Sequence, residues 1–158
     1  KQKTEKDSTR EDLIDDKKYE QVSVGGVVYK KTKDSVKFAL IKDAINKWTF
    51  AKGKIGDSVQ GEKLKQALVR ELKEEIGVND ISVKEKVGEI DVVVNQPDKK
   101  PFDKKIIYYL VETTDEELVA EGTVTVKEVG WFTKQQALEN IGYDNAKQVL
   151  EKAAQMIG

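Results

Sequence analysis

The chain of 158 residues contains no cysteine and no histidine. Without cysteine it can form no disulfide, no thiol nucleophile and no thiolate metal site. Without histidine it has no imidazole base, no Ser-His-Asp triad and no histidine-bound zinc. Catalysis is left to carboxylates, Lys, Arg and Tyr, and the ions that oxygen ligands favour are Mg²⁺, Mn²⁺ and Ca²⁺.

Long apolar runs are also missing. Nothing in the sequence approaches the roughly 18 to 20 apolar residues that a membrane-spanning helix needs, and the first residues lack the apolar region of a signal peptide. We therefore expect a cytoplasmic protein with no membrane partner. The 28 Lys and Arg residues are balanced by 29 Asp and Glu residues, for a net charge of -1. This balance argues against non-specific nucleic-acid binding, which needs a broad basic surface.

The length suits one domain with one core. Residues 1–18 are almost wholly polar and are expected to form a mobile arm. Residues 19–158 are expected to form the domain. Its first segment, 19–31, is a β-rich run interrupted by Gly25 and Gly26, a pair that could mark a bulge or a close approach of a ligand. A second strand at 36–43 would complete a hairpin with the first.

Further along, the sequence alternates between strand and helix signals. Strands near 81–95 and 103–114 flank a turn-rich loop and predict a long hairpin. A strand near 128–132 leads into a short helix capped by Thr133, and an amphipathic helix is predicted from about Tyr143 to Met156. Strands mixed with helices in this order predict an α/β fold, an α/β/α sandwich with a mixed sheet.

The most informative helix is predicted between Gly61 and Gly77. Leucines at 64, 68 and 72 and Ile76 recur every fourth residue, which is the period of a helix with one buried face. Glu71, Glu74 and Glu75 would then share one edge of it. Such like charges destabilise a helix unless a cation lies among them, and a hard divalent ion would serve. A solvated helix rich in Glu and Lys is the simpler interpretation of the composition alone.

The spacing favours the metal-binding interpretation. Gly56, then Glu62, then the run from Arg70 to Val78 resembles the Nudix box, G-x5-E-x7-R-E-U-x-E-E-x-G-U, at every fixed position. The preceding segment, KWTFAKGKI, resembles the W-x-F-P-K-G segment of diadenosine polyphosphate hydrolases in this family, with Ala51 in place of proline. By this context Gly53, rather than Gly56, is the box glycine. The resemblance implies the Nudix fold.

The resemblance also implies roles for the box residues. Glu71, Glu74 and Glu75 would bind Mg²⁺, or Mn²⁺, with a backbone carbonyl near Gly53, and Glu71 could instead be the base. Arg70 would orient a carboxylate through a bidentate contact, and Glu62 would complete the catalytic set. Members of the family often have another metal-binding Glu where this chain has Thr125. Glu121 and Glu128 are the possible substitutes.

The family cleaves nucleoside diphosphates linked to another group. Segments similar to those of diadenosine polyphosphate hydrolases make these nucleotides the expected substrate. Nucleoside triphosphates, RNA 5′ ends that carry pyrophosphate, and a non-enzymatic role in nucleotide sensing or protein binding are the alternatives. The candidate substrate-binding residues are lysines for phosphate and tyrosines for stacking on bases, namely Lys52, Lys54, Lys104, Tyr108, Tyr109 and Tyr143.

Overall fold

The computed structural model describes residues 21–55, 62–122 and 126–158, so the predicted arm, Gly56 and Thr125 lie outside the described residues. A mixed sheet forms the centre, with strand order β3-β2-β1-β6-β5; β4 pairs with β1 and β7 with β2. The strands are β1 (Gln21–Lys31), β2 (Val36–Lys42), β3 (Trp48–Thr49), β4 (Ala51–Lys54), β5 (Ser82–Val94), β6 (Phe102–Glu112) and β7 (Glu128–Thr133).

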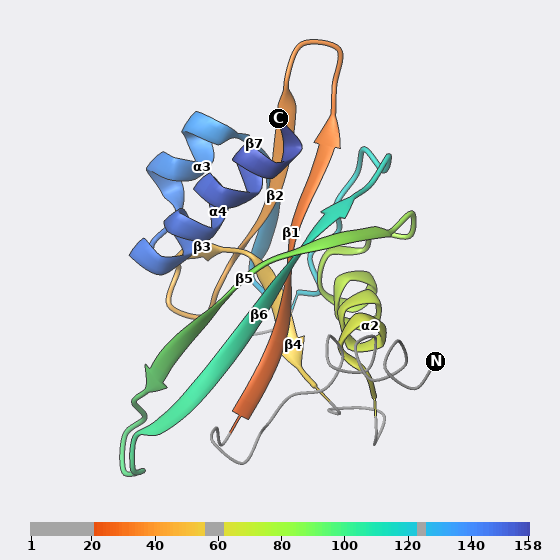
Figure 1. The fold of residues 1–158 in the computed structure, drawn as a ribbon. Helices are drawn as coiled ribbons and strands as arrows, with labels where there is room; N and C mark the ends of the chain where they lie inside the picture. The colour runs from red at the N-terminus through yellow and green to blue at the C-terminus, as the bar shows by residue number, and fades with distance from the viewer. Residues whose placement is uncertain (1–20, 56–61, 123–125) are drawn as a thin grey trace.

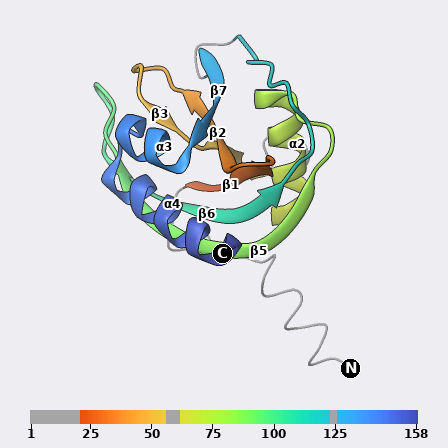
Figure 2. The same cartoon turned by 90° about the horizontal axis from the view of Figure 1, so that it is seen from above.

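Helices cover both faces of this sheet. Helix α2 (Leu64–Ile76) lies on one face, and α3 (Lys134–Asn140) and α4 (Asp144–Ile157) lie on the other (Figure 1). Seen from above, the curved sheet separates α2 from α3 and α4 (Figure 2). Two hydrophobic cores follow, one under α2 and one under the C-terminal helices. The predicted α/β/α sandwich with a mixed sheet is therefore confirmed.

Strand β1 is the central strand and is buried from Val22 to Tyr29. It runs parallel to β6 and antiparallel to β2 and β4. A strand with both faces covered by helices needs apolar residues at successive positions rather than at alternate ones. The run of β-branched residues and glycines in β1 meets this need.

The two glycines of β1 serve packing. Pairing with β6 runs residue by residue from Gln21 to Tyr29, so the strand continues through Gly25 and Gly26 without a bulge. A Cβ at Gly25 would lie 2.5 Å from Cε1 of Tyr108, and one at Gly26 would lie 3.3 Å from the δ carbons of Leu68 and Leu72. Glycine thus makes room for a tyrosine ring on one face and for α2 on the other. The bulge offered by the sequence is therefore wrong, and the ligand contact stays a prediction.

Helix α2 follows its predicted period. Leu64, Leu68, Leu72 and Ile76 are all buried against the sheet. The helix ends at Gly77, whose φ of 72° is the left-handed conformation that glycine adopts without a steric penalty. Because the helix begins at Leu64, Glu62 lies in the segment that leads into it. The hydrophobic face therefore fixes how the polar edge of α2 meets β4.

Candidate active site

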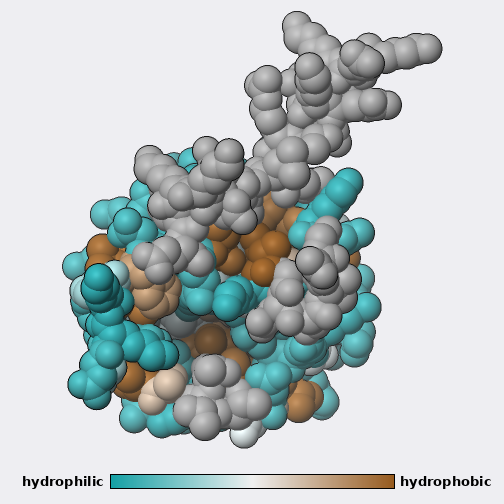
Figure 3. All heavy atoms as spheres, turned by 90° about the horizontal axis from the view of Figure 1, so that it is seen from below, coloured by the Kyte–Doolittle hydropathy of each residue, from teal (hydrophilic) through white to brown (hydrophobic). Residues whose placement is uncertain are grey.

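A cavity of about 590 Å³ opens where β1 begins and β4 ends, beside α2. Three carboxylates, Asp43, Glu71 and Glu75, line it together with three lysines, Lys52, Lys54 and Lys104. Figure 3 views the molecule from below, where both hydrophilic and hydrophobic side chains border a hollowed surface. Gly53 also lines the cavity, so the arrangement brings six of the predicted site residues, from three separate elements, into one place.

Gly53 and Glu71 fix how closely β4 approaches α2. A Cβ built on Gly53 would lie 1.9 Å from Cδ and 2.2 Å from Cγ of Glu71, closer than any real contact. Glycine is therefore required for the Glu71 carboxylate to occupy its position. The backbone of Gly53 lies directly against a box carboxylate, as expected for the box glycine. Because Gly56 lies outside the described residues, Gly53 stays the predicted box glycine.

Glu75 is one helical turn beyond Glu71 and is also buried. The backbone N–H of Lys52 donates a 3.2 Å hydrogen bond to its Oε1 atom. Burial, and next the charge of Glu71, raise the pKa of Glu75 to about 8. This raised pKa favours a protonated Glu75 at neutral pH when no cation is bound.

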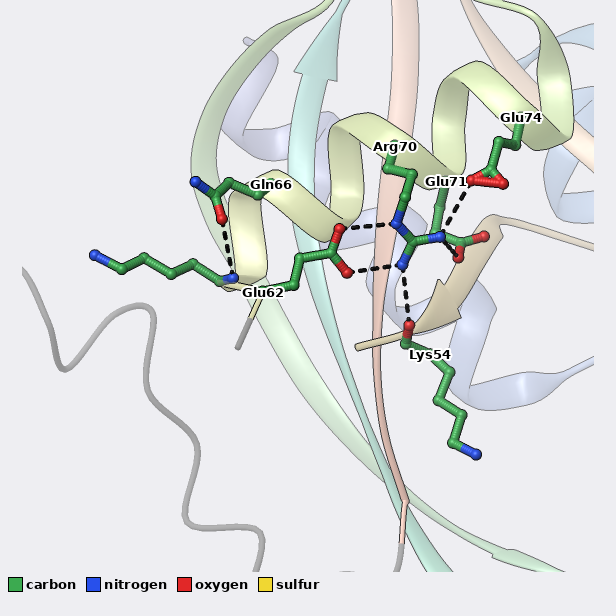
Figure 4. Close-up of polar contacts among 7 residues, drawn as sticks. Lys54, Glu62, Gln66, Arg70, Glu71 and Glu74 are labelled. Atoms are coloured by element: carbon green, nitrogen blue, oxygen red, sulfur yellow. Dashed lines mark hydrogen bonds and ion pairs between the residues drawn. The ribbon is translucent and has the colours of Figure 1, made fainter. Parts of the chain in front are cut away.

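Arg70 holds the box carboxylates in place (Figure 4). Its Nε and Nη2 atoms donate two parallel hydrogen bonds of 2.8 Å to Glu62. Its Nη1 atom donates to Glu71 at 2.6 Å and to Glu74 at 3.2 Å. The hydrogen bonds to Glu62 are the main cause that raises the pKa of Arg70, so the guanidinium stays charged. Glu62 is thus the carboxylate that Arg70 binds in the bidentate manner, and this pair positions Glu71.

Glu74 differs from the other two helix carboxylates. It is 45% exposed and turns toward Arg70 rather than into the cavity. Within residues 21–55, 62–122 and 126–158, no three acidic side chains converge closely enough to hold a metal ion as they stand. The structure brings Glu71 and Glu75 to the cavity, and metal binding by Glu74 stays a prediction.

The pair does have the chemistry of a divalent-ion site. Glu71 and Glu75 are both buried, both line the same cavity, and each is a hard oxygen donor. Burial, and next the charge of Glu71, raise the pKa of Glu75, and a bound cation would offset both effects. The residues present therefore fit Mg²⁺ or Mn²⁺.

The three lysines form the cationic part of the cavity. Lys52 and Lys54 lie on β4, and Lys104 lies on β6, with β1 between the two strands. Burial, and then the charges of Lys52 and Lys54, lower the pKa of Lys104 to about 8. Burial also lowers the pKa of Lys52. Cations gathered in this way favour an anionic ligand such as phosphate.

Of the three tyrosines predicted to stack on bases, two are buried in the core. Tyr108 and Tyr109 are core residues, with 1% and 2% of their surface exposed, on opposite faces of the sheet. A base can stack only on an accessible ring, so the predicted stacking role is corrected for both. Tyr143 is partly exposed and borders a smaller cavity of about 200 Å³, which shares Lys52 and Lys104 with the main one. Its hydroxyl donates to Oδ2 of Asp43.

The structure distinguishes Glu121 from Glu128, the two residues expected to replace the metal-binding Glu that is absent at Thr125. The backbone N–H of Glu121 donates to the Glu75 carbonyl at 3.2 Å, and the charge of Glu121 contributes to the raised pKa of Glu75. Glu128 lies on β7, where its carboxylate pairs with Lys42 at 3.4 Å. Glu121 is therefore the acidic residue close to the helix carboxylates.

Sequence reasoning missed the turn between β2 and β3. Asp43, Ala44 and Ile45 line the cavity together with the lysines. An aspartate followed by a short polar turn gives a turn signal in the sequence, but only the packing of β2 beside β4 shows that this turn faces the site.

The family assignment follows from comparison with known proteins. A family model described as NUDIX domain matches residues 20–153. The chain therefore belongs to the Nudix family. A comparison with curated proteins finds no relative. Nudix hydrolases generally use divalent metal ions.

Solved structures share the fold at low sequence identity. An Ap4A hydrolase of C. elegans in a binary complex is 21% identical, with a TM-score of 0.69 over 87% of this chain and 97% of that one. The NUDIX domain of Shewanella oneidensis NrtR, complexed with ADP ribose, is 16% identical, with a TM-score of 0.72 over 96% and 98%. The E. coli dihydroneopterin triphosphate pyrophosphohydrolase is 15% identical, with a TM-score of 0.66 over 83% and 92%. In the part of the chain that the structure describes, no helix is long and apolar enough to span a membrane.

Proposed function

We propose that this protein is a metal-dependent pyrophosphohydrolase whose substrates are diadenosine polyphosphates. The observation that carries the proposal is one cavity in which Glu71 and Glu75 face Lys52, Lys54 and Lys104. Carboxylates bind a divalent cation and lysines bind a phosphate chain. The cavity therefore offers ligands for both components of a metal–polyphosphate complex.

Each residue has a distinct task in this proposal. Glu71 and Glu75 would hold Mg²⁺, or Mn²⁺, with the backbone of Gly53 beside them. When bound, a divalent ion polarises the phosphoryl oxygens and activates water for attack. The lysines bind and orient the phosphate chain, and Arg70 keeps Glu71 in position while binding Glu62. Glu121, next to Glu75, takes the part of the additional acidic residue.

The reaction adds one water to a phosphoric anhydride bond. With diadenosine tetraphosphate, attack at one phosphorus atom breaks a P–O–P linkage and yields ATP and AMP. The similarity in fold to an Ap4A hydrolase of C. elegans supports this substrate class, and the segment around Trp48 and Lys52 supports it from the sequence. The similarity to NrtR bound to ADP ribose keeps nucleotide sensing as the alternative without catalysis.

A nucleotide panel tests the proposal. The protein is incubated with Mg²⁺ and diadenosine tetraphosphate, single nucleoside triphosphates, ADP-ribose or RNA carrying a 5′-triphosphate, and the products are separated by ion-exchange chromatography. ATP and AMP from diadenosine tetraphosphate, lost in Glu75→Gln and retained in Glu128→Gln, support it. Hydrolysis only of triphosphates or RNA would reject the substrate, and nucleotide binding without hydrolysis would reject the enzyme.

A further inference from the structure

The turn between β2 and β3, residues 43–47, is organised by one carboxylate. Oδ1 of Asp43 accepts the backbone N–H groups of Ile45 at 3.1 Å and Lys47 at 3.0 Å. The backbone closes the same turn, because Asp43 N donates to Lys47 O at 2.8 Å and Asn46 N donates to Asp43 O at 2.9 Å. Asn46 adopts a positive φ of 64°, which asparagine tolerates better than most residues. The turn therefore has a defined shape.

Tyr143 fastens this turn to the C-terminal layer. Its hydroxyl donates to Oδ2 of Asp43, the oxygen that the turn itself leaves available. Lys47 Nζ lies 5.0 Å from the centroid of the Tyr143 ring, so the turn also covers that ring. Next to it, the N–H of Gly142 donates to the carbonyl of Trp48 at 3.0 Å. The turn is thus held at both ends by residues that precede α4.

The held turn places an apolar side chain at the active-site cavity. Ile45 is 64% exposed and lines the same cavity as Glu71, Glu75 and the lysines. A large aliphatic group is costly to leave in water and gains free energy when a ligand covers it. The charged residues of the cavity match the metal ion and the phosphates of a substrate. Ile45 is therefore expected to contact an uncharged part of the substrate.

We propose that Ile45 determines specificity by packing against the nucleoside of the substrate, and that Tyr143 is a positioning residue that holds Ile45 through Asp43. This inference rests on the proposed function, since it concerns how a nucleotide fills the same cavity. It also gives Tyr143 another task than the expected stacking, because its hydroxyl is engaged by Asp43 and Lys47 lies over its ring.

The experiment compares two ligands that differ by a nucleoside. Dissociation constants for ATP and for inorganic tripolyphosphate are measured by titration calorimetry with Ca²⁺ as the cation, in the wild type, Ile45→Ser, Tyr143→Phe and the double variant. Val93→Ser is the matched control, because Val93 is 60% exposed on β5 and is likewise a surface aliphatic residue. Circular dichroism confirms that each variant is folded.

The expected result is selective. Ile45→Ser weakens ATP binding about tenfold, the order of magnitude for loss of a small apolar contact, and changes tripolyphosphate binding less than twofold. Tyr143→Phe shows the same selectivity with a smaller loss, and the double variant loses no more than Ile45→Ser alone, because both changes remove one contact. The control leaves both constants unchanged.

Three results would overturn the proposal. Ile45→Ser could weaken both ligands equally or neither, Tyr143→Phe could leave the ATP constant unchanged, or the losses could add in the double variant. Failure of the proposed function gives a different signature: the wild type then hydrolyses none of the anhydride substrates, while the comparison of ATP with tripolyphosphate still reports on Ile45.

Discussion

Gly53 and Glu71 meet so closely that a single methyl group on the glycine would overlap the carboxylate, 1.9 Å from its carbon. The contact joins β4 to α2 and sets the position of a buried acid in the cavity. It also explains why a strand that carries Lys52 and Lys54 contains a glycine between them.

Gly53→Ala is expected to lower kcat/KM by about a hundredfold, because relief of the overlap moves Glu71 by an ångström or more from its place. Steady-state kinetics with diadenosine tetraphosphate and Mg²⁺ measures the change. Gly88→Ala on β5 is the control, since its Cβ would meet only Lys152 Nζ, at 3.9 Å. Near-normal activity in Gly53→Ala would show that Glu71 is not placed by this contact.

Arg70→Gln is expected to lower the free energy of unfolding by about 2 to 4 kcal/mol, because it leaves the Glu62 carboxylate, only 4% exposed, without its bidentate partner. Urea denaturation monitored by circular dichroism measures the loss. Lys134→Gln breaks the exposed pair of Lys134 and Glu151 and should change stability by less than about 1 kcal/mol. Equal effects of the two substitutions would contradict the structural role of the Arg70–Glu62 pair.

The raised pKa of Glu75 predicts how the metal-free protein responds to pH. Between the ordinary pKa of 4.5 and the folded value of about 8, the folded state binds a proton that the unfolded state has released. Stability therefore falls as pH rises through this window, with a slope of up to about 1.4 kcal/mol per unit from this group. Urea denaturation in EDTA at several pH values measures it.

Glu75→Gln provides the comparison for the pH experiment, because it removes the titrating group and keeps the side-chain shape. The difference in stability between variant and wild type should grow in favour of the variant from pH 5 to pH 8. Parallel curves for the two proteins would show that the pKa of Glu75 is close to its ordinary value. Mg²⁺ should stabilise the wild type more at pH 8 than at pH 6, since the ion binds the ionised carboxylate.

Glu121→Gln is expected to weaken binding of Mn²⁺ about tenfold, because Glu121 adds negative charge beside Glu75. Titration followed by the paramagnetic signal of free Mn²⁺ measures the affinity. Glu128→Gln, which removes a carboxylate paired with Lys42 on β7, should change it less than twofold. The reverse order of effects would assign the additional acidic role to Glu128.

The local elements were predictable from sequence because their signals are local. The four-residue repeat from Leu64 to Ile76 defines a helix with one buried face, and Gly77 defines its end. Thr133 caps α3 through its hydroxyl, which accepts the N–H of Gln136 at 3.1 Å, as its position before the helix predicts. The spacing of the box was also sufficient for the family, since fixed side chains at fixed separations are a property of the chain alone.

The sequence could not show which side chains from distant segments lie in the same cavity or core. Tyr108 and Tyr109 were predicted to stack on bases. The residues around a strand position do not show whether helices cover one face of the sheet or both. Two helix layers bury both rings. The N–H of Lys52 bonds to Glu75 and the backbone of Gly53 lies against Glu71, so the approach of β4 to α2 decides that these two carboxylates face the cavity.

The sequence by itself thus determined the helix, its carboxylates and the family, because these depend on residue types at short separations. Only the tertiary structure decided that Gly53 is the glycine in contact with Glu71, that Lys104 joins Lys52 and Lys54, and that Asp43 meets Tyr143. Each of these contacts joins segments far apart in the chain, and their distances are set by the pairing of strands around β1 and the packing of α2 and α4 on opposite faces.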